Sequence, residues 1–259
     1  MANGTPTALV TGGRRGIGRG CAVCLAEAGF NVIIADLERC EHAEATLAAI
    51  RAHGREAVFV QCDVRDLDGH ARVVDQAFAA FGNLHCLVNN AGVSAITRGD
   101  ILDMSVESWD RCMETNVRGP FFLTQRIVRR WLKTPPETDK FPRSIITVTS
   151  SNVTIVSPTR IEYGASKAGL SMAVKGLAIR LAEENIAVHE IRPGVIRSEM
   201  TAVSKDKYDQ QIAEGLTPIK RWGEPEDIGK ACVVLATGQL PFTLAQVIEP
   251  DGGLRLREL

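Results

Sequence analysis

The fold is decided by the run Ala8-Leu9-Val10-Thr11-Gly12-Gly13-Arg14-Arg15-Gly16-Ile17-Gly18. Its first three residues predict a strand, and the sequence after it predicts a helix to about Ala28. A glycine-rich turn between strand and helix lets the backbone approach a pyrophosphate, and the helix N-terminus offers it free N–H groups. Such a turn can be structural only, but its context favours a nucleotide site. The expected cofactor residues are Gly12, Arg14, Arg15, Gly16, Ile17 and Gly18.

A carboxylate follows the second expected strand, residues 32–35, about twenty residues after the glycines. Asp36 can accept hydrogen bonds from an adenosine ribose there, and its charge would repel a 2′-phosphate. Arg14 and Arg15 have the opposite effect, since a guanidinium in the phosphate loop could pair with a 2′-phosphate. We give Asp36 more weight because it would occupy the ribose position itself. The prediction is NAD(H) in preference to NADP(H).

The composition is that of an ordinary globular chain. Its 259 residues, 45% of them hydrophobic, can bury a full core, and no break in composition divides them into more than one domain. The formal net charge of −1 gives no electrostatic footprint for nucleic acid or for an anionic membrane surface. No apolar run reaches the ~20 residues of a membrane span. Small-molecule partners are therefore expected.

The cysteines favour reduced thiols. There are seven, scattered along a chain without a signal peptide, so we expect a cytoplasmic protein. Cys21-x-x-Cys24 has metal or redox spacing, but no second Cys or His pair completes a site. Packing within a helix, with no metal, is expected for this pair.

Short apolar strands alternate with helical stretches along the rest of the chain. Further strands are expected at residues 57–61, 87–88, 144–149, 186–191 and 246–248. Asn89-Asn90-Ala91-Gly92 follows the fourth strand, where small, amide-bearing residues suit a ligand crevice, although the run could be only a turn. A polar linker at 133–143 precedes the fifth strand.

A long helix is expected from near Ser105 to Leu132, with Pro120 inside it. Proline has no N–H, so the carbonyl of Asn116, four residues earlier, loses its helical donor. In an ordinary helix this is merely a kink. Here the unpaired carbonyl can bind a neighbour, and water is the expected partner.

Tyr163-Gly164-Ala165-Ser166-Lys167 places a phenol and an ammonium four residues apart, just before a helix expected from Gly164 to about Glu184. Positions i and i+4 share a helix face, so both side chains can reach one site. The ammonium should favour the tyrosinate and bring the phenol pKa toward working pH. Taken alone, the pair is weak. Ser150, at a strand end thirteen residues before Tyr163, can donate to a carbonyl oxygen, with Ser151 as its rival.

These motifs together resemble the short-chain dehydrogenase/reductase family. The resemblance rests on their order along nearly the whole chain: residues 11–18, Asp63-Val64, the run 89–92, Asn116, Ser150, Tyr163-x-x-x-Lys167 and Pro193-Gly194. It implies an α/β fold with a single doubly wound (Rossmann) domain, a seven-stranded parallel sheet and helices on both faces.

The resemblance also implies roles for individual residues. Tyr163 would be the general acid in reduction and the base in oxidation, Ser150 would polarise the carbonyl, and Lys167 would lower the pKa of Tyr163 and hold the nicotinamide ribose. Asn116 would join a water-linked proton relay to Lys167. The remaining cofactor residues implied are Asp63 and Val64 for adenine, Asn90 with Ala91 and Gly92 on the nicotinamide side, and Pro193, Gly194, Ile196 and Ser198 near the carboxamide. The family more often has Thr where this chain has Ser198.

The substrate is left open between two classes. The segment 221–227 is typical of the branch that holds 3-oxoacyl-(acyl-carrier-protein) reductases and sugar or polyol dehydrogenases. A basic cluster of Arg126, Arg129, Arg130 and Lys133 could meet an acidic carrier protein or a CoA thioester, although basic residues are favoured near any helix C-terminus. The expected substrate loop, about 196–215, is polar, which disfavours a fatty chain. We expect the acyl reductase ahead of the polyol enzyme, a homotetramer by family habit, and an idle nucleotide sensor as a remote alternative.

Overall fold

A computed structural model describes residues 4–133 and 141–256, so most of the expected linker at 133–143 lies outside the described residues. Seven strands form one parallel sheet in the order β3-β2-β1-β4-β5-β6-β7. They are β1 Thr7–Thr11, β2 Asn31–Asp36, β3 Ala57–Gln61, β4 Cys86–Asn89, β5 Arg143–Val148, β6 Ile186–Ile191 and β7 Val247–Ile248. The prediction of a seven-stranded parallel sheet is confirmed.

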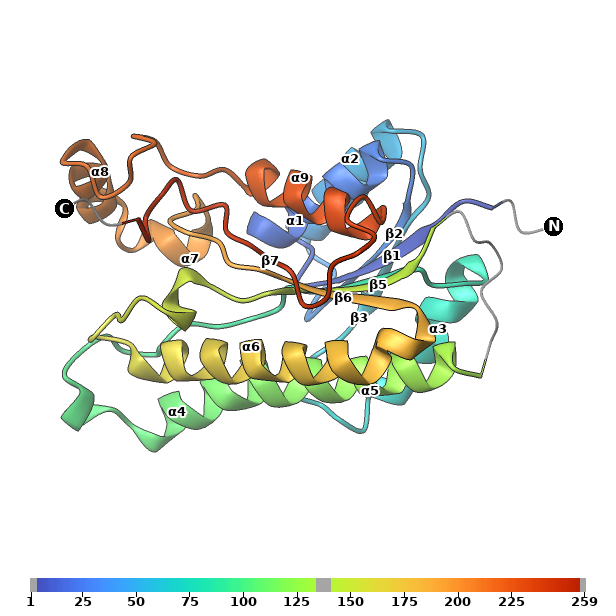
Figure 1. Cartoon of the computed structure of the whole chain (residues 1–259), viewed down its shortest axis with the longest axis horizontal. Helices are drawn as coiled ribbons and strands as arrows, with labels where there is room; N and C mark the ends of the chain where they lie inside the picture. Colours follow the sequence, from blue (N-terminus) through green and yellow to red (C-terminus); the bar gives the residue numbers. More distant parts are fainter. Residues whose placement is uncertain (1–3, 134–140, 257–259) are drawn as a thin grey trace.

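Helices cover both faces of the sheet (Figure 1). On one face lie α1 Gly16–Glu27, α2 Glu41–Ala52 and α9 Pro225–Ala236. On the other lie α3 His70–Phe81, α4 Val106–Met113, α5 Gly119–Trp131 and α6 Ile161–Leu181. The short helices are η1 Ile101–Asp103, η3 Ser151–Val153, η4 Ala182–Glu184, α7 Glu199–Ala202 and α8 Lys205–Ala213.

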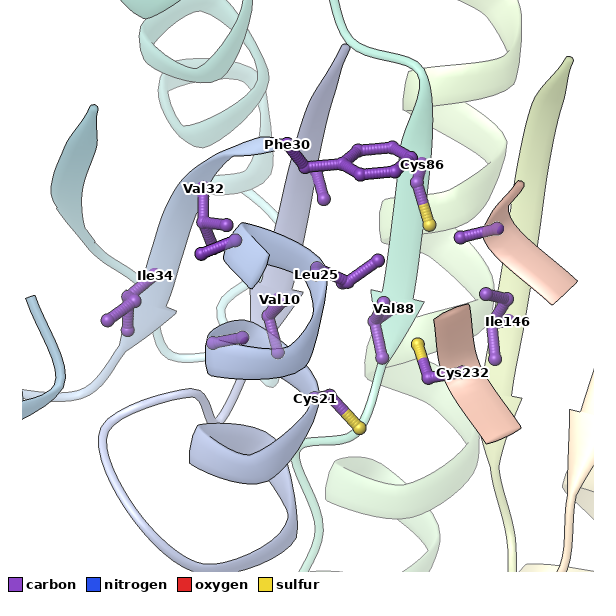
Figure 2. Close-up of a cluster of buried hydrophobic side chains, with 14 of the residues drawn as sticks. Val10, Cys21, Leu25, Phe30, Val32, Ile34, Cys86, Val88, Ile146 and Cys232 are labelled. Atoms are coloured by element: carbon purple, nitrogen blue, oxygen red, sulfur yellow. The ribbon is translucent and has the colours of Figure 1, made fainter. Parts of the chain in front are cut away.

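The two helical layers explain why the central strands read as continuous apolar runs. In β1 the side chains alternate between faces, so Val10 packs under α1 while Leu9 packs on the opposite side. Both are fully buried. Figure 2 shows the first of these cores, in which strand residues lie beneath Cys21 and Leu25 of α1 and Cys232 of α9. Because both faces of such a strand are buried, its sequence does not alternate between polar and apolar residues.

The order of the strands fixes where a ligand can bind. β1 pairs with β2 on one side and with β4 on the other, so the direction of winding reverses between β1 and β4. Ligands of doubly wound sheets bind in the crevice that this reversal opens at the carboxyl ends of the strands. The glycine-rich loop after β1 and the segment after β4 therefore meet at one edge.

The long helix expected from Ser105 to Leu132 is not a continuous α-helix. Between α4 and α5 the chain forms a π-helix, η2 Glu114–Arg118, in which the N–H of Gly119 donates to the carbonyl of Glu114. The π-helix ends at Arg118, two residues before Pro120, which has no backbone N–H to donate. The freed carbonyl predicted for Asn116 stays a prediction. The helix expected from Gly164 begins earlier, at Ile161, so Tyr163 lies inside it.

All seven cysteines belong to the described residues, and all are free thiols. Cys21 and Cys24 are buried in α1, as the packing interpretation requires. Among residues 4–133 and 141–256 no group of His, Cys, Asp and Glu is placed to hold a metal ion. No helix in the same part of the chain has the length and apolar character needed to cross a membrane.

Candidate active site

Two loops meet in direct backbone contact at the crevice between β1 and β4. Gly12 has a φ of +65°, and a Cβ there would lie 2.9 Å from the Cα of Ala91. A Cβ on Gly18 would lie 2.1 Å from the carbonyl oxygen of Gly12 and 2.5 Å from Nδ2 of Asn90. Real Cβ atoms do not approach so closely, so both positions require glycine. The sequence placed these residues in one site, and the structure brings them together.

Asn90 and Thr11 hold the two loops together. The side-chain amide of Asn90 donates to the carbonyls of Thr11 and Gly12 at 2.9 and 3.1 Å. The hydroxyl of Thr11 accepts from the N–H groups of Asn90 and Ala91 and donates to the carbonyl of Val88. Asn90 was predicted to bind the cofactor ribose, but its amide nitrogen is already used within the protein. The connecting role of Thr11 was not predicted, because a threonine at a strand end carries no distinct sequence signal.

The glycine loop leaves room for an anion at the start of α1. No side chain caps α1, and its first turn holds no acidic residue. The N–H groups of that turn therefore have no side-chain partner and are available to an anion. A neighbouring cavity of about 580 Å³ is rich in cationic side chains. It is lined by Arg14, Arg15, Gly16, Arg19, His42, Ala45, Arg197, Ser198, Glu199, Ala202 and Pro225. Close backbone approach, unpaired N–H groups and positive charge together fit a dinucleotide phosphate.

Asp36 is buried at the end of β2 and occupied by Arg14. Its carboxylate accepts from the backbone N–H of Arg14 at 3.1 Å and of Leu37 at 2.8 Å. The Arg14 side chain lies 3.4 Å from the same carboxylate and also pairs with Glu38. The negative charge of Asp36, expected to repel a 2′-phosphate, and the positive charge of Arg14, expected to attract one, therefore compensate each other. Arg14 already has two carboxylate partners and is not free to take a phosphate.

The predicted adenine residues follow β3. Arg65 donates to both carboxylate oxygens of Asp63 and holds the pKa of Asp63 below its usual value. The side chain of Val64 is buried in the second core, and its carbonyl accepts from the ring of His70 at 2.8 Å. Val64 therefore offers a ligand backbone atoms, not a side chain.

The proton-transfer residues lie on α6 and at the end of β5. Tyr163 and Lys167 are both buried, and Lys167 Nζ stands 5.8 Å from the centre of the Tyr163 ring. The hydroxyl of Ser150 is near enough to the phenol to lower its pKa. Ser150 Oγ also accepts from the N–H of Asn152 at 3.1 Å, which fixes the hydroxyl. Ser150, and not Ser151, is thus the serine beside Tyr163.

The prediction that Lys167 brings the pKa of the Tyr163 phenol down toward working pH is wrong for the chain by itself. Burial raises the pKa of Tyr163, while the bond to Ser150 and the charge of Arg160 oppose that rise. Burial also lowers the pKa of Lys167 to about 8. Its Nζ donates to the carbonyl of Val148 at 3.0 Å. Burial, and not the charge of Lys167, is therefore the largest influence on the pKa of Tyr163.

Asn116 connects the segment after β4 to α6. Its side-chain oxygen accepts from the N–H of Val93 at 2.8 Å, and its amide donates to the carbonyl of Val93 and to Ser166 Oγ, each at 2.9 Å. A Cβ on Gly92 would lie 3.1 Å from Asn116 Oδ1 and 3.4 Å from Lys167 Nζ. Asn116, Gly92 and Lys167 therefore share one site, as predicted. Ser166, which also donates to the carbonyl of Tyr163, was missed because its type is common on helices.

The segment after β6 closes the site from the other side. The carbonyl of Pro193 accepts from the N–H of Ser151, and a Cβ on Gly194 would lie 2.6 Å from the Cα of Asp251. Ser198 Oγ lies 3.3 Å from Thr201 Oγ1 in the capping box of α7. Thr201 Oγ1 in turn donates to the carbonyl of Ile196. The hydroxyl predicted to take the carboxamide thus already has a partner.

The expected substrate loop, residues 196–215, is mostly helical. It contains α7 and α8, and side-chain bonds tie it to the body of the protein, among them that of Arg197 Nε to Glu224 at 3.1 Å. Trp222 Nε1 donates to Asp209 at 2.7 Å, and Arg98, from the segment after β4, donates to Ser204 at 2.9 Å. The polar composition noted in the sequence lies largely on exposed positions of α8.

Known proteins resemble this chain over nearly its full length. A family model described as "Enoyl-(Acyl carrier protein) reductase" matches residues 12–255. A 3-oxoacyl-(acyl-carrier-protein) reductase of Staphylococcus aureus is 34% identical, over 96% of this chain and 98% of that protein. A 2-dehydro-3-deoxy-D-gluconate 5-dehydrogenase of Dickeya dadantii is 32% identical, over 95% and 94%. The crystal structure of a 3-oxoacyl-(acyl-carrier protein) reductase from Brucella melitensis in complex with NAD superposes with a TM-score of 0.94 at 44% identity, covering 99% of this chain and 100% of that chain.

Proposed function

The chain belongs to the short-chain dehydrogenase/reductase family, and we propose that it reduces the ketone of a 3-oxoacyl thioester with NADH. It is an NAD(P)-dependent oxidoreductase that interconverts a secondary alcohol and a ketone. One observation carries the proposal: a buried phenol, Tyr163, lies beside Lys167, and Ser150 is near enough to lower the pKa of that phenol. Because burial raises the pKa of this phenol, it keeps its proton at working pH and can give it to a ketone oxygen.

Each residue of the site has a task in this reaction. When bound, the nicotinamide supplies the hydride. Ser150, held by the N–H of Asn152, orients the ketone oxygen toward the phenol. Tyr163 donates the proton to that oxygen and is left as a phenolate. Lys167 would hold the nicotinamide ribose, and Asn116 would lead a replacement proton toward Lys167. The cofactor phosphates would lie on Gly12 to Gly18, and the pyridine ring near Asn90 and Ile196.

The preference for NAD(H) is supported by the pairing of Arg14. A 2′-phosphate would meet the carboxylates of Asp36 and Glu38, and the guanidinium beside them already has both as partners. Because Glu38 would still pair with Arg14, the double change Asp36→Ala, Glu38→Ala should free Arg14 and raise the ratio of kcat/KM for NADPH over NADH by about tenfold. Initial rates with each cofactor measure this ratio. A wild-type enzyme that prefers NADPH would contradict the assignment.

The acyl carrier protein is the proposed partner, and the basic cluster at the end of α5 is its proposed contact. Arg126, Arg129, Arg130 and Lys133 are all exposed. Arg130 lies 3.7 Å from Asp75 and Arg126 donates weakly to the carbonyl of Leu67, so the cluster is only partly engaged within the chain. The positive charge of the cluster that is not paired within the chain would attract an acidic carrier protein.

A sugar or polyol dehydrogenase is the second candidate, and the charged surface of α8 favours it. Lys205, Asp206, Lys207 and Asp209 give a fatty chain little apolar area. Rates with NADH and NADPH on acetoacetyl thioesters, and with NAD⁺ on a polyol panel, separate the two classes. Turnover of polyols alone would overturn the acyl proposal. Lack of turnover on every compound would favour an idle nucleotide-binding sensor.

A homotetramer is supported by apolar side chains that α5 and α6 leave uncovered. Phe122 of α5 is exposed, as are Met172 and Ile179 of α6, which stand seven residues apart on one helix face. Paired helices from two copies would bury them. Light scattering of the full chain measures the assembly, and a monomer would refute it.

A further inference from the structure

Arg160 places a guanidinium directly over the phenol of Tyr163. The carbon at the centre of the guanidinium lies 5.0 Å from the centre of the ring. Two neighbours hold it there: Arg160 Nη2 donates to Asn152 Oδ1 at 2.9 Å, and its Nε donates to Ser157 Oγ at 3.2 Å. All three residues belong to the segment between β5 and α6. The side chain is therefore fixed on the catalytic phenol by the same segment that follows Ser150.

The charge of Arg160 is not neutralised by its neighbours. Both acceptors are uncharged, and none of the described residues brings a carboxylate within ion-pair distance of this guanidinium. A guanidinium also keeps its proton at any pH at which the protein is folded. Lys167 differs from Arg160 in that burial lowers its pKa to about 8; the acceptor of its Nζ, the carbonyl of Val148, is also uncharged.

The other groups that face Tyr163 carry little charge. Cys112 of α4 is a thiol whose pKa burial raises to about 11, and Tyr208 of α8 is a second phenol. Ser150 is a neutral hydroxyl. Glu162, the neighbour of Tyr163 on α6, accepts from Ser108 Oγ at 2.6 Å, in contact with α4. Among these groups, Arg160 is thus the cation whose charge lowers the pKa of Tyr163.

We propose that Arg160 is a positioning residue that holds the Tyr163 ring and stabilises the negative charge which the phenol acquires when its proton leaves. The inference rests on the proposed function, in which Tyr163 gives its proton to the ketone. The charge of Arg160 opposes the rise that burial causes in the pKa of Tyr163, so it favours the ionised phenol. The task that the sequence assigned to Lys167 is therefore shared between two cations at the phenol ring, Lys167 and Arg160.

The chain offers a direct test because it contains only two tyrosines. Protein labelled with ¹³C at the tyrosine ζ carbon gives two NMR signals, and Tyr208→Phe assigns the one from Tyr163. In Arg160→Gln the Tyr163 signal should titrate at least about one pH unit higher than in wild type. Arg160→Lys, which keeps the charge, should restore most of the shift. Arg180→Gln removes an exposed charge from the same helix and is the matched control, with no shift expected.

Two results would overturn the inference. One is an equal titration midpoint in wild type and Arg160→Gln. The other is a wild-type phenol that stays protonated until the fold is lost, with circular dichroism following the fold at each pH. Neither readout requires turnover, so the role of Arg160 is tested even if Tyr163→Phe retains activity and the proposed function fails. With an active substrate, the pH profile of kcat for alcohol oxidation should move with the NMR midpoint, while the NADH dissociation constant stays unchanged.

Discussion

The strands β1 to β4 and the strands β5 to β7 form their parts of the site in different ways. In the first half the contacts are made by backbone: Gly12, Gly18 and Ala91 approach so closely that side chains are excluded. In the second half they are made by buried side chains: Lys167 lies over the ring of Tyr163 and donates to the carbonyl of Val148, and Ser150 accepts from the N–H of Asn152. The first half is thus suited to holding a cofactor and the second to moving a proton. The two tasks should be separable by mutation.

The largest effect is expected for Tyr163→Phe. Loss of the phenol oxygen removes the proton donor but leaves the glycine loops intact, so turnover should fall about a thousandfold while the NADH dissociation constant changes little. Steady-state rates and NADH fluorescence titration measure the two quantities. If binding and turnover fell together, the proposed separation of the halves would be wrong.

Gly18→Ala should produce the reverse pattern. The new methyl group would lie 2.1 Å from the carbonyl oxygen of Gly12, so the two loops must separate. Overpacking of this kind costs about 1–3 kcal/mol, and the NADH affinity should fall about tenfold to a hundredfold. Gly176→Ala is the matched control, since no atom lies within 4 Å of its added carbon. Equal affinities in both variants would show that the loop contact does not matter for binding.

The buried ammonium of the second half should make stability depend on pH. The pKa of Lys167 is about 8 when folded and 10.5 in the reference state, so the unfolded chain binds more protons between these values. Stability therefore rises with pH in this window, and the penalty of roughly 3 kcal/mol is fully present below it. Lys167→Met removes the penalty and should be more stable than wild type at about pH 7.

Urea unfolding of wild type and Lys167→Met at about pH 7 and about pH 9.5 gives the measurement. The difference in unfolding free energy should shrink by about 2 kcal/mol at the higher pH. Tyr163 is common to both proteins and cancels. A difference that does not vary with pH would mean that Lys167 is not charged and buried as described.

The smallest effect is expected on the surface of the second half. Lys205 and Asp209 form an exposed i, i+4 pair on α8. Exposed pairs contribute little, so Lys205→Ala should leave the melting temperature and the NADH affinity unchanged within error. Differential scanning calorimetry and the same titration would check this. A clear loss of stability would mean that the Lys205 side chain on α8 contributes to the fold, which its exposed contacts do not indicate.

The sequence predicted the sheet, both helical layers and the meeting of the glycine loop with the segment after β4. It failed where a local signal had more than one outcome. Pro120 indicated a kink in an α-helix, but the chain forms a π-helix before it. The role of Ser198 toward a ligand stays a prediction; its hydroxyl lies in the capping box of α7. Arg160 gave no signal, because an arginine before a helix is ordinary until its neighbour in space is known.

The sequence by itself determined where two backbone segments can come into direct contact. Only glycine can occupy such positions, and the spacing of the glycines is visible in the chain. Apolar runs likewise determined the strands, since a strand buried on both faces cannot alternate. Only the tertiary structure decided which charges meet. Arg14 is paired with Asp36 and Glu38, while Arg160 lies over the ring of Tyr163. Charge depends on distance and burial, and neither can be read from the order of residues.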